Sequence, residues 1–195
     1  MNEGVTLYFL RHGETEWNFA RRIQGQTDTD LNDTGRAQAA GNAIRLREMH
    51  RDLAALDFIA SPLRRCRQTM EIVRRELAVP RDDYLTDERL MEIHFGHWQG
   101  KHWPDVAEFD PEGFSARQQN PFHWRPTGGE SYADLAERVS TWLAGITRDS
   151  VVVSHGGVSR ALRGLVFDLD PAEITELRVP QDKVLVINKN EMNWV

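Results

Sequence analysis

Residues 6–13, with the sequence TLYFLRHG, are the stretch that decides the fold. An apolar run of this length that stops at polar residues is typical of a buried β-strand, because a strand covered on both faces carries few polar side chains. The run ends at Arg11, and His12 and Gly13 follow directly. A cation and a histidine are therefore expected at the carboxyl end of a buried strand.

Other short apolar runs predict further strands at 57–60, 151–154 and 184–188. Segments with helical spacing of apolar residues lie at 35–49, 63–77, 131–146 and 158–167. Ser61 is expected to cap the second of these helices, with Pro62 as its first residue. Strands that alternate with helices favour an α/β layered domain.

The segment 96–129 breaks this alternation. It holds Trp98, Trp103 and Trp124 among proline, glycine and polar residues, and its periodicity is poor. We interpret it as a lid or insertion over one end of the sheet, within a single domain that spans residues 1–195. An ordinary surface excursion fixed by its aromatic residues is the alternative.

Length and composition set the broad class of protein. The 195 residues suit one domain with an insertion, and 40% hydrophobic residues are enough for a core. No apolar stretch approaches the ~20 residues that span a bilayer, and the polar start lacks the pattern of a secretory signal. A formal net charge of −6 without a basic stripe argues against a nucleic-acid partner. With a single cysteine as well, we expect a cytoplasmic protein with no membrane partner.

Two of the predicted strands end in a histidine followed by glycine, and these ends define a candidate site. His12 follows the first strand beside Arg11, and His155 with Gly156 follows the strand at 151–154. Ligands of open α/β sheets bind beyond the carboxyl ends of the strands, and glycine lets the backbone approach a ligand closely. If the two strands are neighbours, both histidines and one guanidinium face a single pocket suited to an anion.

Three arginines and one glutamate could complete that pocket. Arg64, Arg65 and Arg67 open the predicted helix after the strand at 57–60. Cations are disfavoured near the start of a helix because the helix dipole is positive there. An anionic ligand bound by these arginines would offset that repulsion. Glu92 could protonate a departing oxygen. Taken singly, the arginines would more often form a solvated helix face, and Glu92 an ordinary surface carboxylate.

Residues 10–18, LRHGETEWN, resemble the opening motif of the histidine phosphatase superfamily, in the branch that includes the cofactor-dependent phosphoglycerate mutases. The spacing of glycine, aspartate and leucine in residues 25–35 fits the same branch. Further blocks of the family pattern follow in order at 61–69, 90–100, 128–131 and 153–157. The resemblance therefore spans nearly the whole chain.

The resemblance implies a three-layer α/β/α sandwich around a mostly parallel central sheet, and it implies a role for each matching residue. His12 would attack phosphorus and become phosphohistidine, while Glu92 would protonate the leaving alkoxide and then activate water. The phosphoryl oxygens would be held by Arg11, Asn18, Arg65, His155 and the Gly156 N–H. Further candidates for substrate binding are Gln24, Gly25, His94 and Trp98. Neither a metal nor another cofactor is expected.

Departures from the family pattern favour a phosphatase. The mutases carry Arg and then Tyr after the acidic residue to grip a carboxylated substrate, whereas Ile93, His94 and Phe95 follow Glu92 here. The chain is also shorter than typical mutases. Many relatives carry Glu where Gln99 stands, so an electrostatic role at that position is in doubt. The expected activity is hydrolysis of a small phosphorylated metabolite.

The sequence leaves two other functions open and argues against three. Mutase-type phosphoryl transfer and a non-catalytic phosphate-binding regulatory module on the same fold stay open. Cys66 lacks the Cys-x5-Arg loop of cysteine phosphatases, and we interpret it as a packing residue. No histidine follows Ser159 as a serine hydrolase would require, and the histidines at 94, 97 and 102 lack a zinc spacing. A homodimer is compatible with the sequence.

Overall fold

One mixed sheet runs through the middle of the part of the chain that the computed structural model describes, residues 2–50 and 52–195. Its strands, in chain order, are β1 (Leu7–Arg11), β2 (Asp57–Ala60), β3 (Leu85–Thr86), β4 (Ser150–Ser154), β5 (Val184–Ile187) and β6 (Met192–Trp194). They lie in the order β3-β2-β4-β1-β5-β6. The first four strands of this order are parallel, β5 is antiparallel to β1, and β6 is antiparallel to β5. The mostly parallel sheet expected from the sequence is confirmed.

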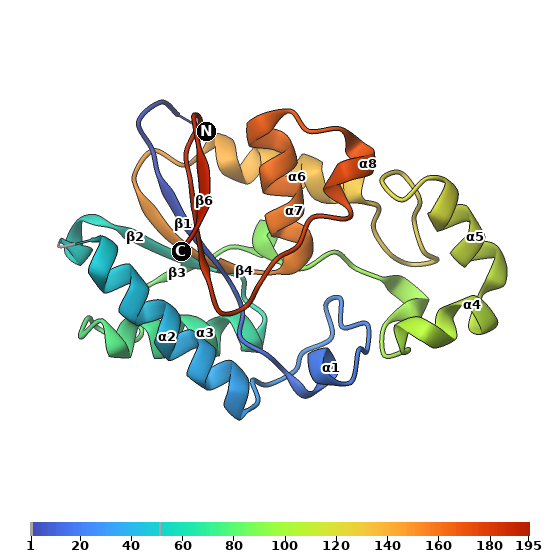
Figure 1. Cartoon of the computed structure of the whole chain (residues 1–195), viewed down its shortest axis with the longest axis horizontal. Coiled ribbons are helices and arrows are strands. Elements are labelled where there is room, and N and C mark those ends of the chain that lie inside the picture. Colours follow the sequence, from blue (N-terminus) through green and yellow to red (C-terminus); the bar gives the residue numbers. More distant parts are fainter. Residues whose placement is uncertain (1, 51) are drawn as a thin grey trace.

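Helices cover both faces of this sheet, and the three-layer sandwich is confirmed (Figure 1). They are α1 (Glu16–Phe19), α2 (Asp33–Met49), α3 (Arg64–Glu76), α4 (Val106–Phe109), α5 (Pro111–Gln119), α6 (Tyr132–Ala144), α7 (Gly156–Phe167) and α8 (Pro171–Ile174). Short 3₁₀ turns lie at Leu53–Ala55, Glu88–Leu90, Gly96–Trp98 and Trp103–Asp105. Helices α2 and α3 cover one face, while α6 and α7 cover the other.

The strands divide their side chains between two hydrophobic cores because successive residues of a strand point to opposite faces. Phe9 of β1 and Val152 of β4 belong to the core under α6 and α7. Leu10 and Val153, their neighbours in the chain, belong to the core under α2 and α3. Burial on both faces explains why these strands read as unbroken apolar runs.

Elements with weaker sequence signals depart from expectation. β3 and β6 have only two and three residues, and both residues of β3 are exposed, so neither strand forms an apolar run. The expected start of α3 is wrong: the helix begins at Arg64, and Leu63 caps it without a side-chain hydrogen bond. Ser61 is not the cap, because its hydroxyl lies 2.8 Å from Nε2 of His155.

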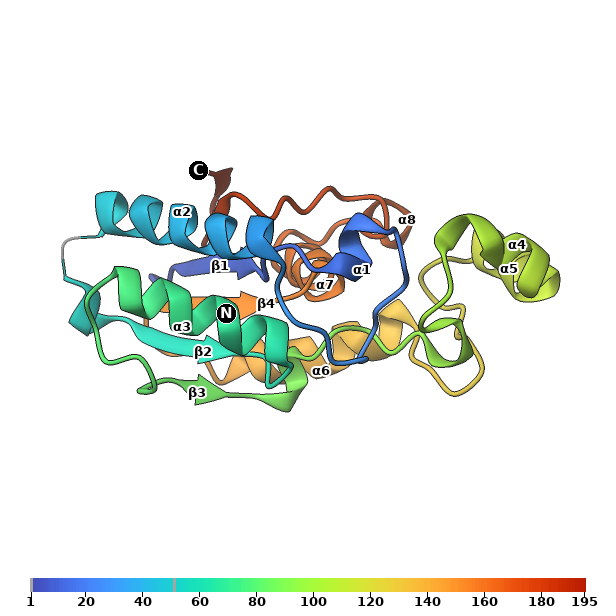
Figure 2. The ribbon, with the colours of Figure 1, turned by 90° about the horizontal axis from the view of Figure 1, so that it is seen from below.

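The segment 96–129 contains α4 and α5, which the poor periodicity did not reveal. With Ile23 and Phe95 from outside the segment, its aromatic residues form a small third hydrophobic cluster in which Trp98 is fully buried. The Trp98 ring lies 4.4 Å from that of Trp124, and its Nε1 donates to Asp110 at 2.8 Å. Figure 2 shows α4 and α5 beyond the end of the sheet toward which the arrowheads of β2 and β4 point. That this segment acts as a lid within one domain stays a prediction.

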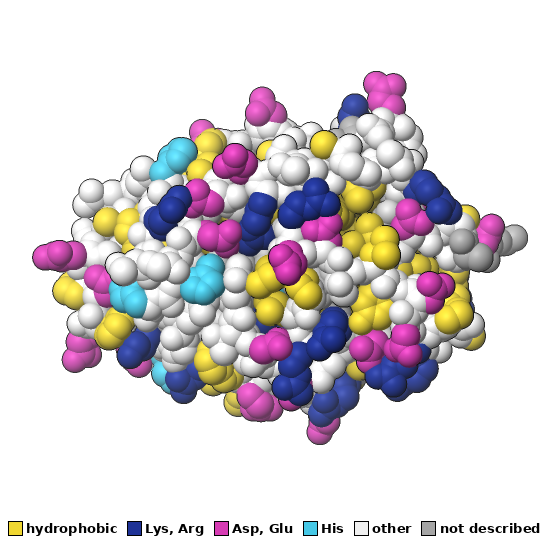
Figure 3. All heavy atoms as spheres, turned by 180° about the vertical axis from the view of Figure 1, so that it is seen from behind, with side chains coloured by type: hydrophobic (Ala, Val, Ile, Leu, Met, Phe, Trp, Pro, Cys, Tyr) yellow, Lys and Arg dark blue, Asp and Glu magenta, His cyan; other side chains and the backbone are white. Residues whose placement is uncertain are grey.

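The surface carries both signs of charge. On the face drawn in Figure 3, basic and acidic side chains are interspersed, with histidines toward one end. None of the helices in the described part of the chain is long and apolar enough to cross a membrane.

Candidate active site

The site lies where β1 and β4 end side by side. The two strands are parallel neighbours with Arg11 opposite Ser154, and the N–H of His12 donates to the Ser154 carbonyl at 2.9 Å. This register carries His12 and His155 past the sheet edge together, with ring centroids 5.2 Å apart. The neighbouring strands that the sequence argument required are present.

His12 is held as a neutral base with one nitrogen available. Its Nδ1 lies 2.8 Å from the Gly13 carbonyl oxygen, an acceptor, so Nδ1 carries the proton and Nε2 keeps its lone pair. Burial, followed by the charges of Arg65 and Arg11, lowers the pKa of His12 well below its ordinary value. A neutral imidazole is the form that can act as a nucleophile.

The guanidinium groups of Arg11 and Arg65 are fixed by backbone carbonyls. Arg65 donates to Thr27 at 2.8 Å and to Gly25 at 2.7 Å, and Arg11 donates to Val179 at 2.9 Å. Burial lowers the pKa of Arg11 to about 10. The Nε of each is buried and has no partner among the described residues. Because an unpaired buried donor is costly, these N–H groups favour an acceptor such as a phosphate oxygen.

Only one of the three arginines that open α3 turns into the site. Arg65 is fully buried, whereas Arg64 and Arg67 are exposed. Arg64 forms an ion pair with Asp30 at 2.8 Å, with both side chains about half exposed. Of these three arginines, Arg65 alone is therefore placed where an anionic ligand could offset its charge.

His155 is fully buried beside Arg65 and is not among the residues that line the cavity, and its direct contact with a phosphoryl oxygen stays a prediction. Its Nδ1 accepts from Arg65 at 3.2 Å, and Nε2 donates to the Ser61 hydroxyl at 2.8 Å. Burial, followed by the charge of Arg65, lowers the pKa of His155 well below its ordinary value. Burial likewise raises the pKa of the neighbouring Cys66 thiol to about 12, in keeping with a packing residue. In this arrangement His155 supports Arg65.

Glu92 faces the start of α7 through its carboxylate. The N–H of Gly157 donates to Oε1 at 3.0 Å and to Oε2 at 3.2 Å. A Cβ at Gly157 would overlap Glu92 Oε1, so glycine is required there for this approach. Gly156 was expected at the site from the sequence, whereas the role of Gly157 was not.

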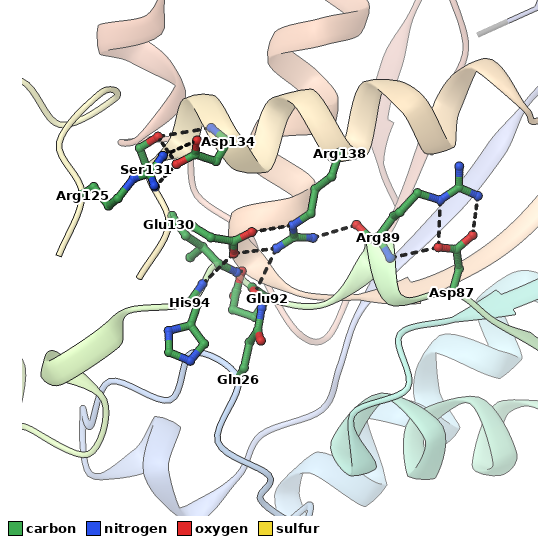
Figure 4. Close-up of polar contacts among 11 residues, drawn as sticks. Gln26, Asp87, Arg89, Glu92, His94, Arg125, Glu130, Ser131, Asp134 and Arg138 are labelled. Atoms are coloured by element: carbon green, nitrogen blue, oxygen red, sulfur yellow. Dashed lines mark hydrogen bonds and ion pairs between the residues drawn. The ribbon is translucent and has the colours of Figure 1, made fainter. Parts of the chain in front are cut away.

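The backbone of Glu92 is held as firmly as its side chain (Figure 4). Its carbonyl accepts from Gln26 at 3.0 Å and from Arg138 at 3.1 Å. Arg138 forms two bonds to the Glu130 carboxylate at 2.9 and 3.0 Å, and Glu130 also accepts from the His94 N–H at 2.9 Å. A guanidinium–carboxylate pair thus fixes both sides of the short segment that carries Glu92.

These groups surround a cavity of about 210 Å³. Of the residues expected at the site, those that line it are Arg11, His12, Asn18, Gln24, Gly25, Arg65, Glu92 and Gly156. His94 and Trp98 are not brought to it. His94 uses Nδ1 to accept from the Gly96 N–H at 3.0 Å, and Trp98 lies in the hydrophobic cluster of segment 96–129.

Residues that the sequence argument missed form much of the cavity wall. They are Arg22, Ile23, Ile93, Phe95, Trp103, Tyr132, Gly157 and Arg160. Arg160 carried a usable signal, because it lies four residues after Gly156 in a helix and so shares its face. Trp103 was singled out only as one aromatic residue of segment 96–129, and Tyr132 gave no local signal. Among the residues that the structure describes, no group of three or more His, Cys, Asp or Glu side chains is placed to hold a metal ion.

Loop contacts join the floor of the cavity to segment 96–129. Gln99 Oε1 accepts from the backbone N–H of Gln26 at 2.9 Å. Gly25, which accepts from Arg65, has a φ of +53° and would meet Gln99 if it carried a Cβ. Gln181 donates to the His12 carbonyl at 3.0 Å and to Asn18 Oδ1 at 3.2 Å.

The fold and this site define a phosphatase built around a histidine, and comparison with known proteins agrees. A model of the histidine phosphatase superfamily (branch 1) matches residues 7–195, and the chain belongs to that superfamily. The chain is 38% identical to the metal-independent phosphoserine phosphatase of Arabidopsis thaliana over 201 aligned positions, which cover 100% of this chain and 80% of the relative.

Two further relatives share a named activity. The glucosyl-3-phosphoglycerate phosphatase of Mycolicibacterium vanbaalenii is 36% identical over 84% of this chain and 74% of its own length. The solved structure of a mycobacterial glucosyl-3-phosphoglycerate phosphatase in complex with VO3 superposes with a TM-score of 0.80 at 30% identity, covering 98% of this chain and 96% of that one.

Proposed function

We propose that this chain hydrolyses a phosphomonoester of a small metabolite through a phosphohistidine on His12, without a metal. The chain is a histidine phosphatase-type hydrolase, and the proposal concerns how it works. The observation that carries it is the 2.8 Å contact between His12 Nδ1 and the Gly13 carbonyl, which leaves Nε2 free beside two arginines with buried, unpaired Nε donors.

In the first step, Nε2 of His12 attacks phosphorus and the bond to the ester oxygen breaks. Arg11 and Arg65 neutralise the charge on the phosphoryl oxygens, and the N–H groups at the start of α7 add to that field. The protonated carboxyl of Glu92 gives its proton to the departing alkoxide. The products are phosphohistidine and a free alcohol.

In the second step, Glu92 takes a proton from water, and the resulting oxygen nucleophile attacks the phosphohistidine. The P–N bond breaks, inorganic phosphate leaves, and His12 returns to its neutral form. The hydrogen bonds from Gly157 and the clamp on the Glu92 backbone support this role, because a group that acts twice must stay in place between the steps.

The relatives' names and the size of the cavity support a small substrate. The named activities concern phosphoserine and glucosyl-3-phosphoglycerate. A cavity of about 210 Å³ lies below the roughly 300–1,000 Å³ of pockets for drug-sized ligands. A cytoplasmic location and a homodimer stay predictions.

A p-nitrophenyl phosphate assay with and without chelator tests the proposal. We expect turnover that chelator leaves unchanged and that His12→Ala removes. His123→Ala, at an exposed histidine of segment 96–129, is the matched control and should retain activity. Activity lost on chelation would contradict the metal-free mechanism, and activity retained by His12→Ala would exclude this nucleophile.

Rapid acid–base quenching separates the proposal from its rivals. The phosphoryl-enzyme should be labile in acid and stable in alkali, as a P–N bond is, and absent from His12→Ala. Tight binding of phosphorylated ligands without turnover would favour the regulatory module. Transfer to 3-phosphoglycerate only after priming with 2,3-bisphosphoglycerate would favour the mutase.

A further inference from the structure

The cavity holds more positive charge than one phosphoryl group requires. Arg11, Arg22, Arg65 and Arg160 line it, against the single carboxylate of Glu92. A phosphate monoester carries a charge of about −2 at most, which Arg11 and Arg65 match. The two remaining arginines therefore need a separate explanation.

Arg22 is already engaged by the protein. One of its terminal nitrogens donates to the Gly100 carbonyl, and the other lies 3.1 Å from Nε2 of His102. Its guanidinium also lies 5.5 Å from the centre of the Trp17 ring. Both terminal nitrogens of Arg22 therefore have partners within the protein, which explains Arg22 as part of the cavity wall.

Arg160 keeps free donors at the cavity. Its Nε donates to the Leu177 carbonyl at 2.9 Å, which fixes the plane of the guanidinium, and its Nη1 has only a long contact of 3.4 Å to the Tyr132 hydroxyl. No carboxylate of the described residues lies within ion-pair distance of it. A half-buried cation without a counterion at a ligand cavity favours an anionic ligand group.

The position of Arg160 ties it to the phosphoryl site. Its Nη1 lies 3.7 Å from the place where a Cβ on Gly156 would stand, and Arg11 Nε lies 3.7 Å from the same place. The two guanidinium groups therefore flank Gly156 within twice that distance of each other. An anion on Arg160 would belong to the same small molecule as the phosphate, only a few bonds from it.

Tyr132 supplies a neutral donor beside Arg160. It is a buried residue of α6, and burial raises the pKa of its phenol, so the hydroxyl keeps its proton. One cation and one neutral hydroxyl suit a group with a single negative charge, and the planar fork of arginine matches the two oxygens of a carboxylate.

We propose that Arg160, with the Tyr132 hydroxyl, forms a second anion site that binds a carboxylate, so that the preferred substrates are short phosphomonoesters of hydroxy acids. The inference rests on the proposed phosphatase function. It also revises an argument made from the sequence: the residues after Glu92 lack a carboxylate grip, but α7 and α6 provide one from elsewhere in the chain.

The test compares two substrates that differ only at the carboxylate. 3-Phosphoglycerate has a carboxylate where glycerol 3-phosphate has a hydroxymethyl group. We expect the wild-type kcat/KM to be about 10-fold or more higher for 3-phosphoglycerate, as one charged hydrogen-bonded contact allows. Arg160→Met should bring this ratio close to one, and Arg160→Lys should give an intermediate value. Because the ratio is internal to each variant, a general loss of activity cancels.

Arg47→Met is the matched control, since Arg47 is an exposed residue in the last turn of α2. It should keep the wild-type ratio. Equal kcat/KM for the two substrates in the wild type, or an unchanged ratio in Arg160→Met, would overturn the proposal. A preference for 1,3-propanediol bisphosphate over 3-phosphoglycerate would overturn the assignment to a carboxylate.

Binding titrations keep the inference separate from the catalytic proposal. If the protein hydrolysed none of these esters, the proposed function would fail, yet the ratio of Kd values for the same two compounds would still decide the inference. A wild-type preference for 3-phosphoglycerate that Arg160→Met abolishes would support the carboxylate site, and equal Kd values would refute it.

Discussion

Two regions of the molecule face each other across the cavity and are built in opposite ways. The floor, made of the ends of β1 and β4 with Arg65, holds its side chains through hydrogen bonds to the backbone of neighbouring elements. Segment 96–129 holds together through stacked aromatic rings in a hydrophobic cluster separate from the two main cores. Directional hydrogen bonds therefore position the side chains of the floor, while the packing of aromatic rings holds segment 96–129 together.

The two regions also differ in how many contacts a single substitution would disturb. Every floor contact of Arg65 goes to a carbonyl or to a buried histidine, so a substitution there disturbs several partners at once. Trp103, the part of segment 96–129 that lines the cavity, carries a stacked Arg117 at 5.0 Å and lies half-buried.

The largest expected effect comes from breaking the floor. Arg65→Met should lower kcat/KM for p-nitrophenyl phosphate by about 10³-fold, or about 4 kcal/mol, as loss of a preorganised donor to the transition state does. Arg67→Met, two residues along the same helix and exposed, should change it by less than about 2-fold. Steady-state kinetics of the two variants measure the contrast. Similar losses of kcat/KM in both would contradict a specific role of Arg65 in the transition state.

A pair of tryptophans tests whether segment 96–129 is stabilised independently. Trp98→Ala removes the centre of its cluster and should speed amide exchange within 96–129 by about 100-fold, or about 3 kcal/mol, without changing α6 and α7. Trp142→Ala, in the core under α6 and α7, should destabilise the whole fold. Hydrogen–deuterium exchange measures both. Global destabilisation by Trp98→Ala would show that the segment is not independent.

The smallest expected effect is a pH dependence of the free energy of unfolding that arises from His12 in the floor. The pKa of His12 is lowered by folding, so below about pH 6.5 the unfolded chain binds a proton that the folded chain does not, and stability is lost as the pH falls. Between pH 7 and 5.5 this histidine should cost about 1 kcal/mol. In urea unfolding, His12→Gln should lose about 1 kcal/mol less free energy of unfolding over this pH range than the wild type does. His123→Gln should match the wild type, and an equal loss in all three proteins would contradict the linkage.

The sequence predicted the floor better than the wall opposite it, for a physical reason. His12, Arg65 and Glu92 sit in short local patterns next to buried strands, and the strands and main helices follow from periodicity. The start of α3 was misjudged because the Ser61 hydroxyl serves His155, a contact made across 94 residues of chain. Trp103 and Tyr132 reach the cavity from distant elements that only tertiary packing brings together, whereas Arg160 shares a helix face with Gly156.

The contact between Gln99 and the loop at Gln26 has a thermodynamic consequence for the enzyme cycle. Arg65 donates to the Gly25 carbonyl, and the N–H of the next residue, Gln26, donates to Gln99, so Arg65 and segment 96–129 both contact one short loop. Coupling free energies are reciprocal. If phosphate binding at Arg65 orders that loop, then ordering of the aromatic segment must raise the affinity for phosphate by the same factor.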